Sequence, residues 1–179
     1  ALDYFFRTLR LDPLSEHVNS GIGMVYNYIN ENEKALEYIK KNEELFPQWY
    51  AQYLDKLDVL CKLKRYDEAY VMIDKLENDP NSALSAAHLR SLYFAYQGNR
   101  AESLRYLEQF KTETSGAMGD PEPVFISQIY ILLGEDEKAL DYLEHGMESM
   151  ASPFIFIKIL DYWDRLRKHP RYIQAAMKI

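Results

Sequence analysis

Few residues of this 179-residue chain have the types and spacing that chemistry requires. None of the four histidines, His17, His88, His145 and His169, has a second histidine or a cysteine at the short spacing of a metal site. The single cysteine, Cys61, excludes an internal disulfide. No HExxH, CxxC, GxSxG or phosphate-loop motif occurs in the sequence. We therefore expect no catalytic residues, no bound metal and no cofactor.

Three weaker features could still suggest chemistry. The GxG at Gly21–Gly23 lies in a helical pattern, so we interpret it as a helix-packing contact. Carboxylate pairs such as Glu43-Glu44 would have to be buried to act as acids or bases, and a solvated acidic surface explains them more simply. Cys61 is followed by Lys62 and is either a slightly activated thiol or, the reading we favour, a small packed side chain.

Composition limits the possible partners. A formal net charge of −7 argues against a nucleic-acid backbone, which needs a basic stripe. No apolar run reaches the roughly 18 residues that a membrane span requires. A single cysteine is compatible with a reducing compartment, so we expect a cytoplasmic protein that binds neither nucleic acid nor membrane.

A periodic pattern runs along most of the chain. Aligning the small residue that follows each acidic turn gives gaps of 34, 34, 34 and 36 between Ala1, Ala35, Ala69, Ser103 and Ala139. Four positions later comes a large apolar residue, at Phe5, Ile39, Ile73, Leu107 and Leu143. A spacing of four places the two residues on one helix face. Repeated copies of one structural unit explain this pattern.

Each copy has the pattern of a helix, a short turn and a second helix. Upstream of each small residue, apolar residues recur at intervals of three and four, as in Tyr53, Leu57 and Leu60. Proline follows the second helix at Pro13, Pro47 and Pro80. The sequence therefore predicts an all-α protein.

The 34-residue period and its motifs resemble the tetratricopeptide repeat (TPR) family. The matching residues of the first complete copy are Ile22-Gly23 and Tyr26 on the first helix, Ala35 and Ile39 on the second helix, and Pro47 after it. Three places depart from the family pattern: Asn19, Lys56-Leu57 and Arg90. The resemblance implies a right-handed α-α superhelix of about four helical hairpins, with a preceding half-repeat and a C-terminal capping helix pair. The expected segments are 1–13 for the half-repeat, 14–47, 48–81, 82–115 and 120–151 for the hairpins, and 152–179 for the cap, all in one solenoid domain spanning 1–179.

Two regions interrupt the period. The stretch Thr112–Pro123 has two Gly and two Pro, and we interpret it as a longer loop, or else a hinge, that ends the preceding helix. The aromatic segment after Met150 is expected to form a capping helix, a turn and a final helix from about Pro170. Tyr162–Tyr172 resembles the tail of TPR arrays in bacterial signalling and regulatory proteins. Because the chain starts at Ala1 in a helical pattern, we expect it to be part of a longer protein.

The resemblance also implies a concave groove lined by the first helix of each hairpin. Its expected partner-binding residues are His17, Ser20, Met24, Asn27, Tyr28, Leu54, Asp58, Cys61, Lys62, His88, Leu92 and Tyr96. Acids at Asp55 and Asp58 stand where the chaperone-binding members of the family carry groups that hold a peptide carboxylate, so we expect no such ligand. The mixture of apolar, aromatic and polar side chains in this groove suits an amphipathic helix or an extended segment with apolar anchors.

We therefore expect a non-enzymatic protein–protein interaction scaffold, the regulatory part of a larger bacterial signalling or transcription protein. Its partner would be a peptide, a protein or a domain of the same full-length chain. One alternative is a structural spacer that dimerises through the aromatic cap around Trp163. Another is small-molecule binding or catalysis around His88, Tyr96 and Cys61.

Overall fold

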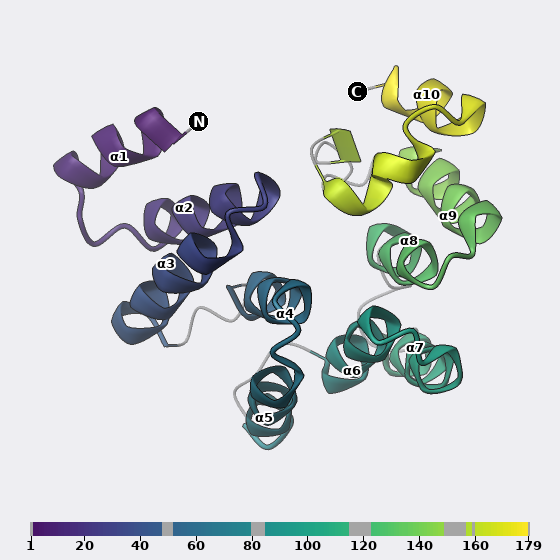
Figure 1. Ribbon diagram of the computed structural model, residues 1–179, viewed down its shortest axis with the longest axis horizontal. Coiled ribbons are helices and arrows are strands. Elements are labelled where there is room, and N and C mark those ends of the chain that lie inside the picture. The colour runs from purple at the N-terminus through teal and green to yellow at the C-terminus, as the bar shows by residue number, and fades with distance from the viewer. Residues whose placement is uncertain are drawn as a thin grey trace. The chain divides into compact units, whose positions relative to one another are not determined.

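A computed structural model describes residues 2–47, 52–79, 85–114, 123–148, 157–158 and 160–178 (Figure 1). The described residues form helices and turns and include no strand, which confirms the all-α class. The helices are α1 (Leu2–Leu11), α2 (Glu16–Tyr28), α3 (Asn32–Leu45), α4 (Gln52–Lys62), α5 (Tyr66–Glu77), α6 (Ala86–Tyr96), α7 (Arg100–Thr114), α8 (Pro123–Leu132), α9 (Asp136–Glu148), the 3₁₀ helix η2 (Asp161–Leu166) and α10 (Pro170–Ala176).

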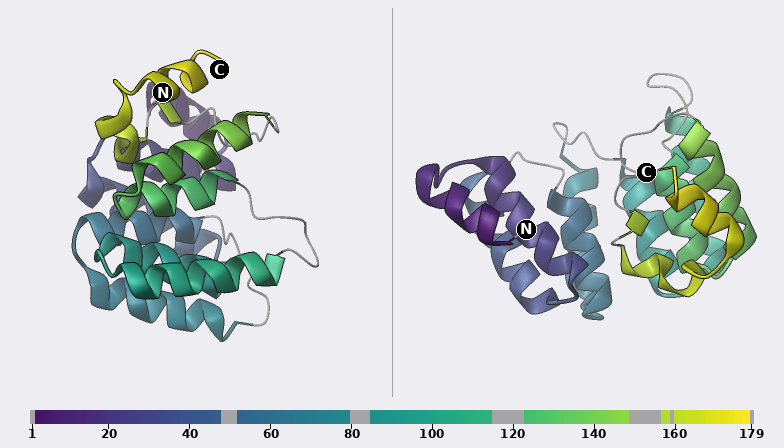
Figure 2. Two further views of the ribbon diagram at one scale, coloured as in Figure 1. Left: turned by 90° about the vertical axis from the view of Figure 1, so that its right-hand side faces the viewer. Right: turned by 90° about the horizontal axis from the view of Figure 1, so that it is seen from above.

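The chain divides into two compact units, Ala1–Leu89 and Arg90–Ile179, which we call the N-terminal and C-terminal units. In the N-terminal unit α2 packs against α1, α3 and α4, and α4 packs in turn against α3 and α5. In the C-terminal unit α8 packs against α9 and η2, and α10 lies on α9, as Figure 2 shows from two directions. The division falls inside α6 and thus within the predicted hairpin 82–115.

The same turn joins the two helices of four successive hairpins. One residue in each turn has a left-handed backbone: Asn30 at φ 60°, Lys64 at 58°, Gly98 at 70° and Gly134 at 78°. The next residue donates its N–H to a carbonyl five positions back, in the pairs Glu31–Tyr26, Arg65–Leu60, Asn99–Phe94 and Glu135–Tyr130, at 2.8–2.9 Å. This is the hydrogen bond of a Schellman motif, which satisfies carbonyls left open at a helix end. The turn recurs with the interval of the sequence pattern.

The aligned small residues lie where the two helices of a hairpin meet. Ala35, Ala69, Ser103 and Ala139 are all fully buried. In the third hairpin the small residue is Ser103, which also forms hydrogen bonds across the hairpin. The hydroxyls of Ser91 and Ser103 each donate to the other residue's carbonyl at 2.9 Å. Both hydroxyls are therefore satisfied inside the core, as buried polar groups must be.

The GxG of α2 is a packing contact. A Cβ added at Gly23 would lie 2.9 Å from Cγ1 of Ile39 on α3, and one added at Gly21 would overlap the Phe5 ring of α1. Both glycines are buried. The glycines therefore let α2 lie close to helices on both sides, as the sequence predicts.

Stacked aromatic rings occupy equivalent positions in three of the four hairpins. The pairs are Tyr26–Tyr38, Phe94–Tyr106 and Tyr130–Tyr142, with ring centroids 5.4, 5.7 and 5.5 Å apart. Such stacks contribute beyond the apolar area they bury. The second hairpin has Leu60 and Met72 at the same two positions.

The C-terminal segment closes the unit with a buried aromatic pair and one arginine. Trp163 is fully buried, and its ring lies 5.6 Å from that of Tyr172. The Arg171 guanidinium reaches three carboxylates along one face of α9, those of Glu137, Asp141 and Glu144, at 2.7–2.9 Å. The final helix begins at Pro170, as predicted, whereas residues 161–166 form a 3₁₀ helix where the sequence predicted an α-helical cap.

The loop predicted at Thr112–Pro123 starts later than expected. Helix α7 continues to Thr114, and the hydroxyls of Thr112 and Thr114 donate to carbonyls one turn back, at 2.9 and 2.8 Å. Pro123 then opens α8, a position that proline tolerates because its missing N–H is not needed there. Residues 115–122 lie outside the described residues.

Among the described residues, no helix is both long enough and apolar enough to span a bilayer.

The left-handed turn residues give a stability prediction. Lys64→Gly should raise the free energy of unfolding by about 1 kcal/mol, because glycine adopts positive φ without the Cβ clash. Lys41→Gly, at an exposed position inside α3, should lower it by about 1 kcal/mol through lost helix propensity. Urea denaturation followed by circular dichroism measures both. A Lys64→Gly protein less stable than the parent would contradict the turn geometry.

Candidate functional site

Several predicted groove residues meet on α2 and α4 of the N-terminal unit. We define the polar cluster as Asn27, Tyr28, Asp55, Asp58, Cys61 and Lys62. The Asn27 amide donates to Asp58 Oδ2 at 2.7 Å, and Lys62 Nζ donates to Asn27 Oδ1 at 3.0 Å. Lys62 also pairs with Asp58 at 3.0 Å. These contacts join the last turn of α2 to the middle of α4.

The local sequence explains the geometry of this triad. Asp58 and Lys62 are four residues apart on α4, with the acid on the N-terminal side, the favoured order for a helical ion pair. Their side chains are only 14 % and 13 % exposed, and Asn27 is buried. A charge pair so far from water needs further hydrogen bonds to offset desolvation, and both oxygen and nitrogen of the Asn27 amide supply them.

Asp55 adds a carboxyl group that has no direct hydrogen bond or ion pair among the described residues. The pKa of Asp55 is raised to about 7, mainly because burial desolvates the carboxyl group. The neighbouring charge of Asp58 adds to this increase and outweighs the opposing effect of Lys62. Asp58 already binds Lys62 and Asn27, whereas Asp55 has no hydrogen bond or ion pair to a described residue. This face of α4 therefore favours a neutral or cationic group over an anion.

Burial also decides the chemistry of Cys61 and Tyr28. Burial raises the pKa of the Cys61 thiol to about 12, with a further contribution from Asp58. A thiol in this state is a poor nucleophile, so the activated-thiol interpretation is wrong and the packed side chain is correct. Burial likewise holds the pKa of the Tyr28 phenol above its ordinary value, with the charges of Asp55 and Asp58 adding to the effect. Both groups are neutral hydrogen-bonding or packing groups at neutral pH.

The other predicted site residues are more scattered. His17 is exposed on α2, Ser20 and Met24 are half-buried on the same helix, and Leu54 is half-buried on α4. His88 is buried, and burial lowers its pKa to about 4, so its imidazole is uncharged at neutral pH. Leu92, which is buried, and Tyr96, which is half-buried, belong to the C-terminal unit, so the structure assigns them no place beside the polar cluster.

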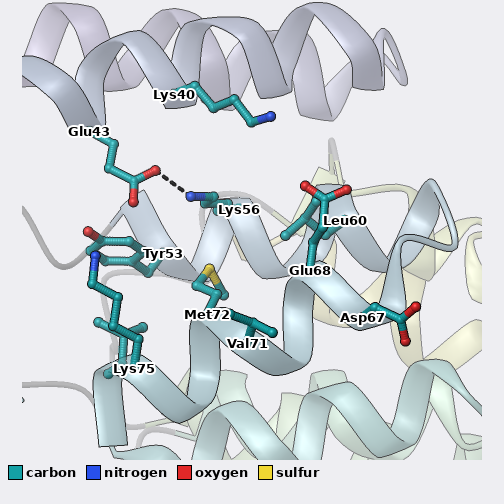
Figure 3. Close-up of a pocket in the computed structure, with 11 residues that line it drawn as sticks. Lys40, Glu43, Tyr53, Lys56, Leu60, Asp67, Glu68, Val71, Met72 and Lys75 are labelled. Carbon is teal, nitrogen blue, oxygen red and sulfur yellow. Dashed lines mark hydrogen bonds and ion pairs between the residues drawn. The ribbon is translucent and has the colours of Figure 1, made fainter. Parts of the chain in front are cut away.

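A pocket that the sequence did not indicate lies between α3 and α5, over α4 (Figure 3). Its volume is about 420 Å³. We call it the α3–α5 pocket, and its lining residues are Lys40, Glu43, Tyr53, Lys56, Leu60, Asp67, Glu68, Val71, Met72, Lys75 and Leu76. The only sequence signal for it is the loss of the aromatic pair at Leu60 and Met72.

The two sites use opposite faces of α4. Tyr53, Lys56 and Leu60 line the pocket, whereas Asp55, Asp58 and Lys62 belong to the polar cluster. With about 100° of rotation per residue, these two sets point in nearly opposite directions from the helix axis. Helix α4 therefore separates a polar site from a largely apolar one.

No family model and no curated protein matches the chain. Within the described ranges, no three or more His, Cys, Asp or Glu side chains gather closely enough to hold a metal ion.

The desolvated Asp55 carboxyl gives a pH prediction. Because its folded pKa lies above its unfolded value, the folded state retains a proton that the unfolded state loses, and stability falls as pH rises from about 4 to about 7. Asp55→Asn should remove this slope and raise the free energy of unfolding at pH 8 by about 2 kcal/mol.

Urea titrations from pH 4 to 8 measure this effect, with Glu44→Gln, an exposed carboxylate on α3, as the control. If parent and Asp55→Asn proteins show the same pH dependence, the carboxyl is not desolvated as described.

Proposed function

We propose that this chain is a non-enzymatic protein-interaction module built from tetratricopeptide-type repeats. The observation that carries the proposal is the recurrence of one helical hairpin, with a left-handed turn residue at Asn30, Lys64, Gly98 and Gly134. The buried small residue after each turn supports it as well. Hairpins of this kind stack into a right-handed superhelix whose first helices line a concave groove, a surface suited to holding a peptide.

The polar cluster and the residues N-terminal to it on α2 form the proposed binding face. Met24 and Leu54 are half-buried and offer apolar contacts, while Asp55 offers a carboxyl group with no direct ion pair to a described residue. Such a face fits a peptide segment that has an apolar anchor and a basic side chain. The two side chains would be one turn apart in a helical segment and two residues apart in an extended one. It disfavours a C-terminal carboxylate, as the sequence also predicts. We place this module in a larger bacterial regulatory protein, where the segment belongs to a partner or to another domain of the same chain.

A peptide-display selection against the whole chain tests this function. We expect selected peptides to carry Leu, Ile or Phe beside Lys or Arg, and to bind about tenfold more weakly to Asp55→Asn and about fivefold more weakly to Met24→Ala. Glu44→Gln is the matched control and should leave the affinity unchanged, since its side chain is exposed on α3.

Fluorescence anisotropy with the selected peptides gives the dissociation constants, and urea denaturation shows that each variant is folded. Peptides that bind with full affinity to both Asp55→Asn and Met24→Ala would place the binding face elsewhere. Failure to select any peptide would count against a peptide-binding function.

A dimerising spacer is the alternative function, and one observation favours it. Ile173 on α10 and Met177, the residue that caps the end of this helix, lie four residues apart and are 42 % and 81 % exposed, which makes a small apolar stripe at the C-terminal end of the last helix. The stripe differs from the surface the sequence suggested, because Trp163 is fully buried and cannot contact a second copy. Substitution of Trp163 would therefore unfold the cap and would not report on dimerisation.

Sedimentation velocity over a range of protein concentrations tests the alternative. If α10 mediates dimerisation, the parent should shift to a dimer and Ile173→Ser/Met177→Ser should remain a monomer. Val71→Ser, at an exposed apolar position in the N-terminal unit, serves as the control. A parent that remains monomeric at every concentration would rule out this role.

A further inference from the structure

The α3–α5 pocket exists because the second hairpin lacks a pair of rings. In the other hairpins the equivalent positions hold stacked aromatic side chains, such as Tyr26 and Tyr38 at 5.4 Å. Leu60 and Met72 are both buried at these positions, but they have no ring that extends outward from the helix interface. Both line the pocket. The space is therefore a specific departure of one repeat from the pattern of the rest.

The pocket has an apolar interior that no described side chain covers. Leu60, Met72 and Leu76 form its buried part, and the Tyr53 ring lies at one end (Figure 3). Val71 is 66 % exposed although it belongs to the lining. A volume of about 420 Å³ lies within the range of small-molecule sites, which are mostly apolar with a few polar groups.

Three lysines and three carboxylates line the pocket, and two of the carboxylates are held in ion pairs. Glu43 is neutralised by an ion pair with Lys56, and Glu68 is held by the Arg65 guanidinium at 2.5–2.8 Å. Lys40 and Lys75 form no ion pair with any residue in the described ranges.

Figure 3 shows Lys40 extending from α3 on the side of Glu68, and Lys75 extending from α5 to the Tyr53 ring, so the two ammonium groups lie in different parts of the pocket. Asp67 lies at the far end of the pocket, and its carboxylate points away from the other lining residues. An anionic group beside Lys40 or Lys75 would therefore meet a net positive field.

We propose that the α3–α5 pocket binds a small amphipathic carboxylate, an aliphatic monocarboxylic acid of roughly ten carbons. Its chain occupies the space over Leu60 and Met72, and its carboxylate lies beside the ammonium group of Lys40 or of Lys75. The site is independent of the proposed peptide-binding face, since α4 separates the two. Loss of one activity by substitution would leave the other measurable.

Isothermal titration calorimetry of the whole chain with decanoate, below its micelle concentration, tests the site. We expect saturable binding at one site, and about tenfold weaker binding of decanol, which has the same chain without the charge. Lys40→Gln/Lys75→Gln should weaken decanoate binding about tenfold and leave decanol unchanged. Lys41→Gln removes an adjacent exposed charge outside the lining and should have no effect.

Two further variants test where the aliphatic chain lies. Leu60→Tyr/Met72→Tyr introduces a ring pair like those of the other hairpins. It should abolish decanoate binding by filling the α3–α5 pocket. Because that change alters the core, Val71→Ser provides an independent test at an exposed position, where we expect about fivefold weaker binding. Ile29→Ser, 54 % exposed and outside the pocket, is its control.

Three results would overturn the proposal: heats that do not saturate, equal affinity for decanoate and decanol, or decanoate binding that survives both Lys40→Gln/Lys75→Gln and Val71→Ser. If a peptide selected against the chain displaces bound decanoate from the pocket while Asp55→Asn leaves that peptide's affinity intact, the pocket is instead a peptide site.

Discussion

The close approach of two helices inside each hairpin is the constraint on which the rest of the structure depends. Alanine or serine at one fully buried position lets the second helix approach the first, and a left-handed turn residue sets the angle at which the chain returns. At Gly23 even a methyl group would press on Ile39. Once this contact is fixed, the helical period decides which side chains face the partner helix and which remain available for binding.

Helix α4 shows how that constraint creates two sites of different chemistry. Its contact with α2 buries Asp58 and Lys62, so the pair must be completed by Asn27 to offset the cost of desolvation. The same burial raises the pKa of Asp55 to about 7. On the opposite face, the contacts with α3 and α5 leave an apolar space because no ring pair fills it. One short helix therefore presents a polar face and an apolar face at once.

Function in such a fold is expected at the positions where copies differ. The turn residues, the small residues and the large apolar residues after them serve packing in every copy, so they carry no information about a partner. Leu60 and Met72 break the aromatic pattern, and the polar cluster belongs to one pair of neighbouring first helices. The two proposed binding sites lie at these departures, and both belong to the N-terminal unit.

The sequence by itself determined the helical class, the hairpin interval, the burial of the small residues and the start of the last helix at Pro170, because these depend on local periodicity and turn chemistry. Its resemblance to a repeat family implied a shared surface for Asn27, Asp58 and Lys62, and in the structure these three side chains contact one another. The sequence favoured a packed Cys61 without excluding an activated thiol, and it did not show that Trp163 is buried or that α7 extends to Thr114. Desolvation, pairing and empty space depend on which helices pack together, so only the tertiary structure decided the charge of Asp55 and the existence of the α3–α5 pocket.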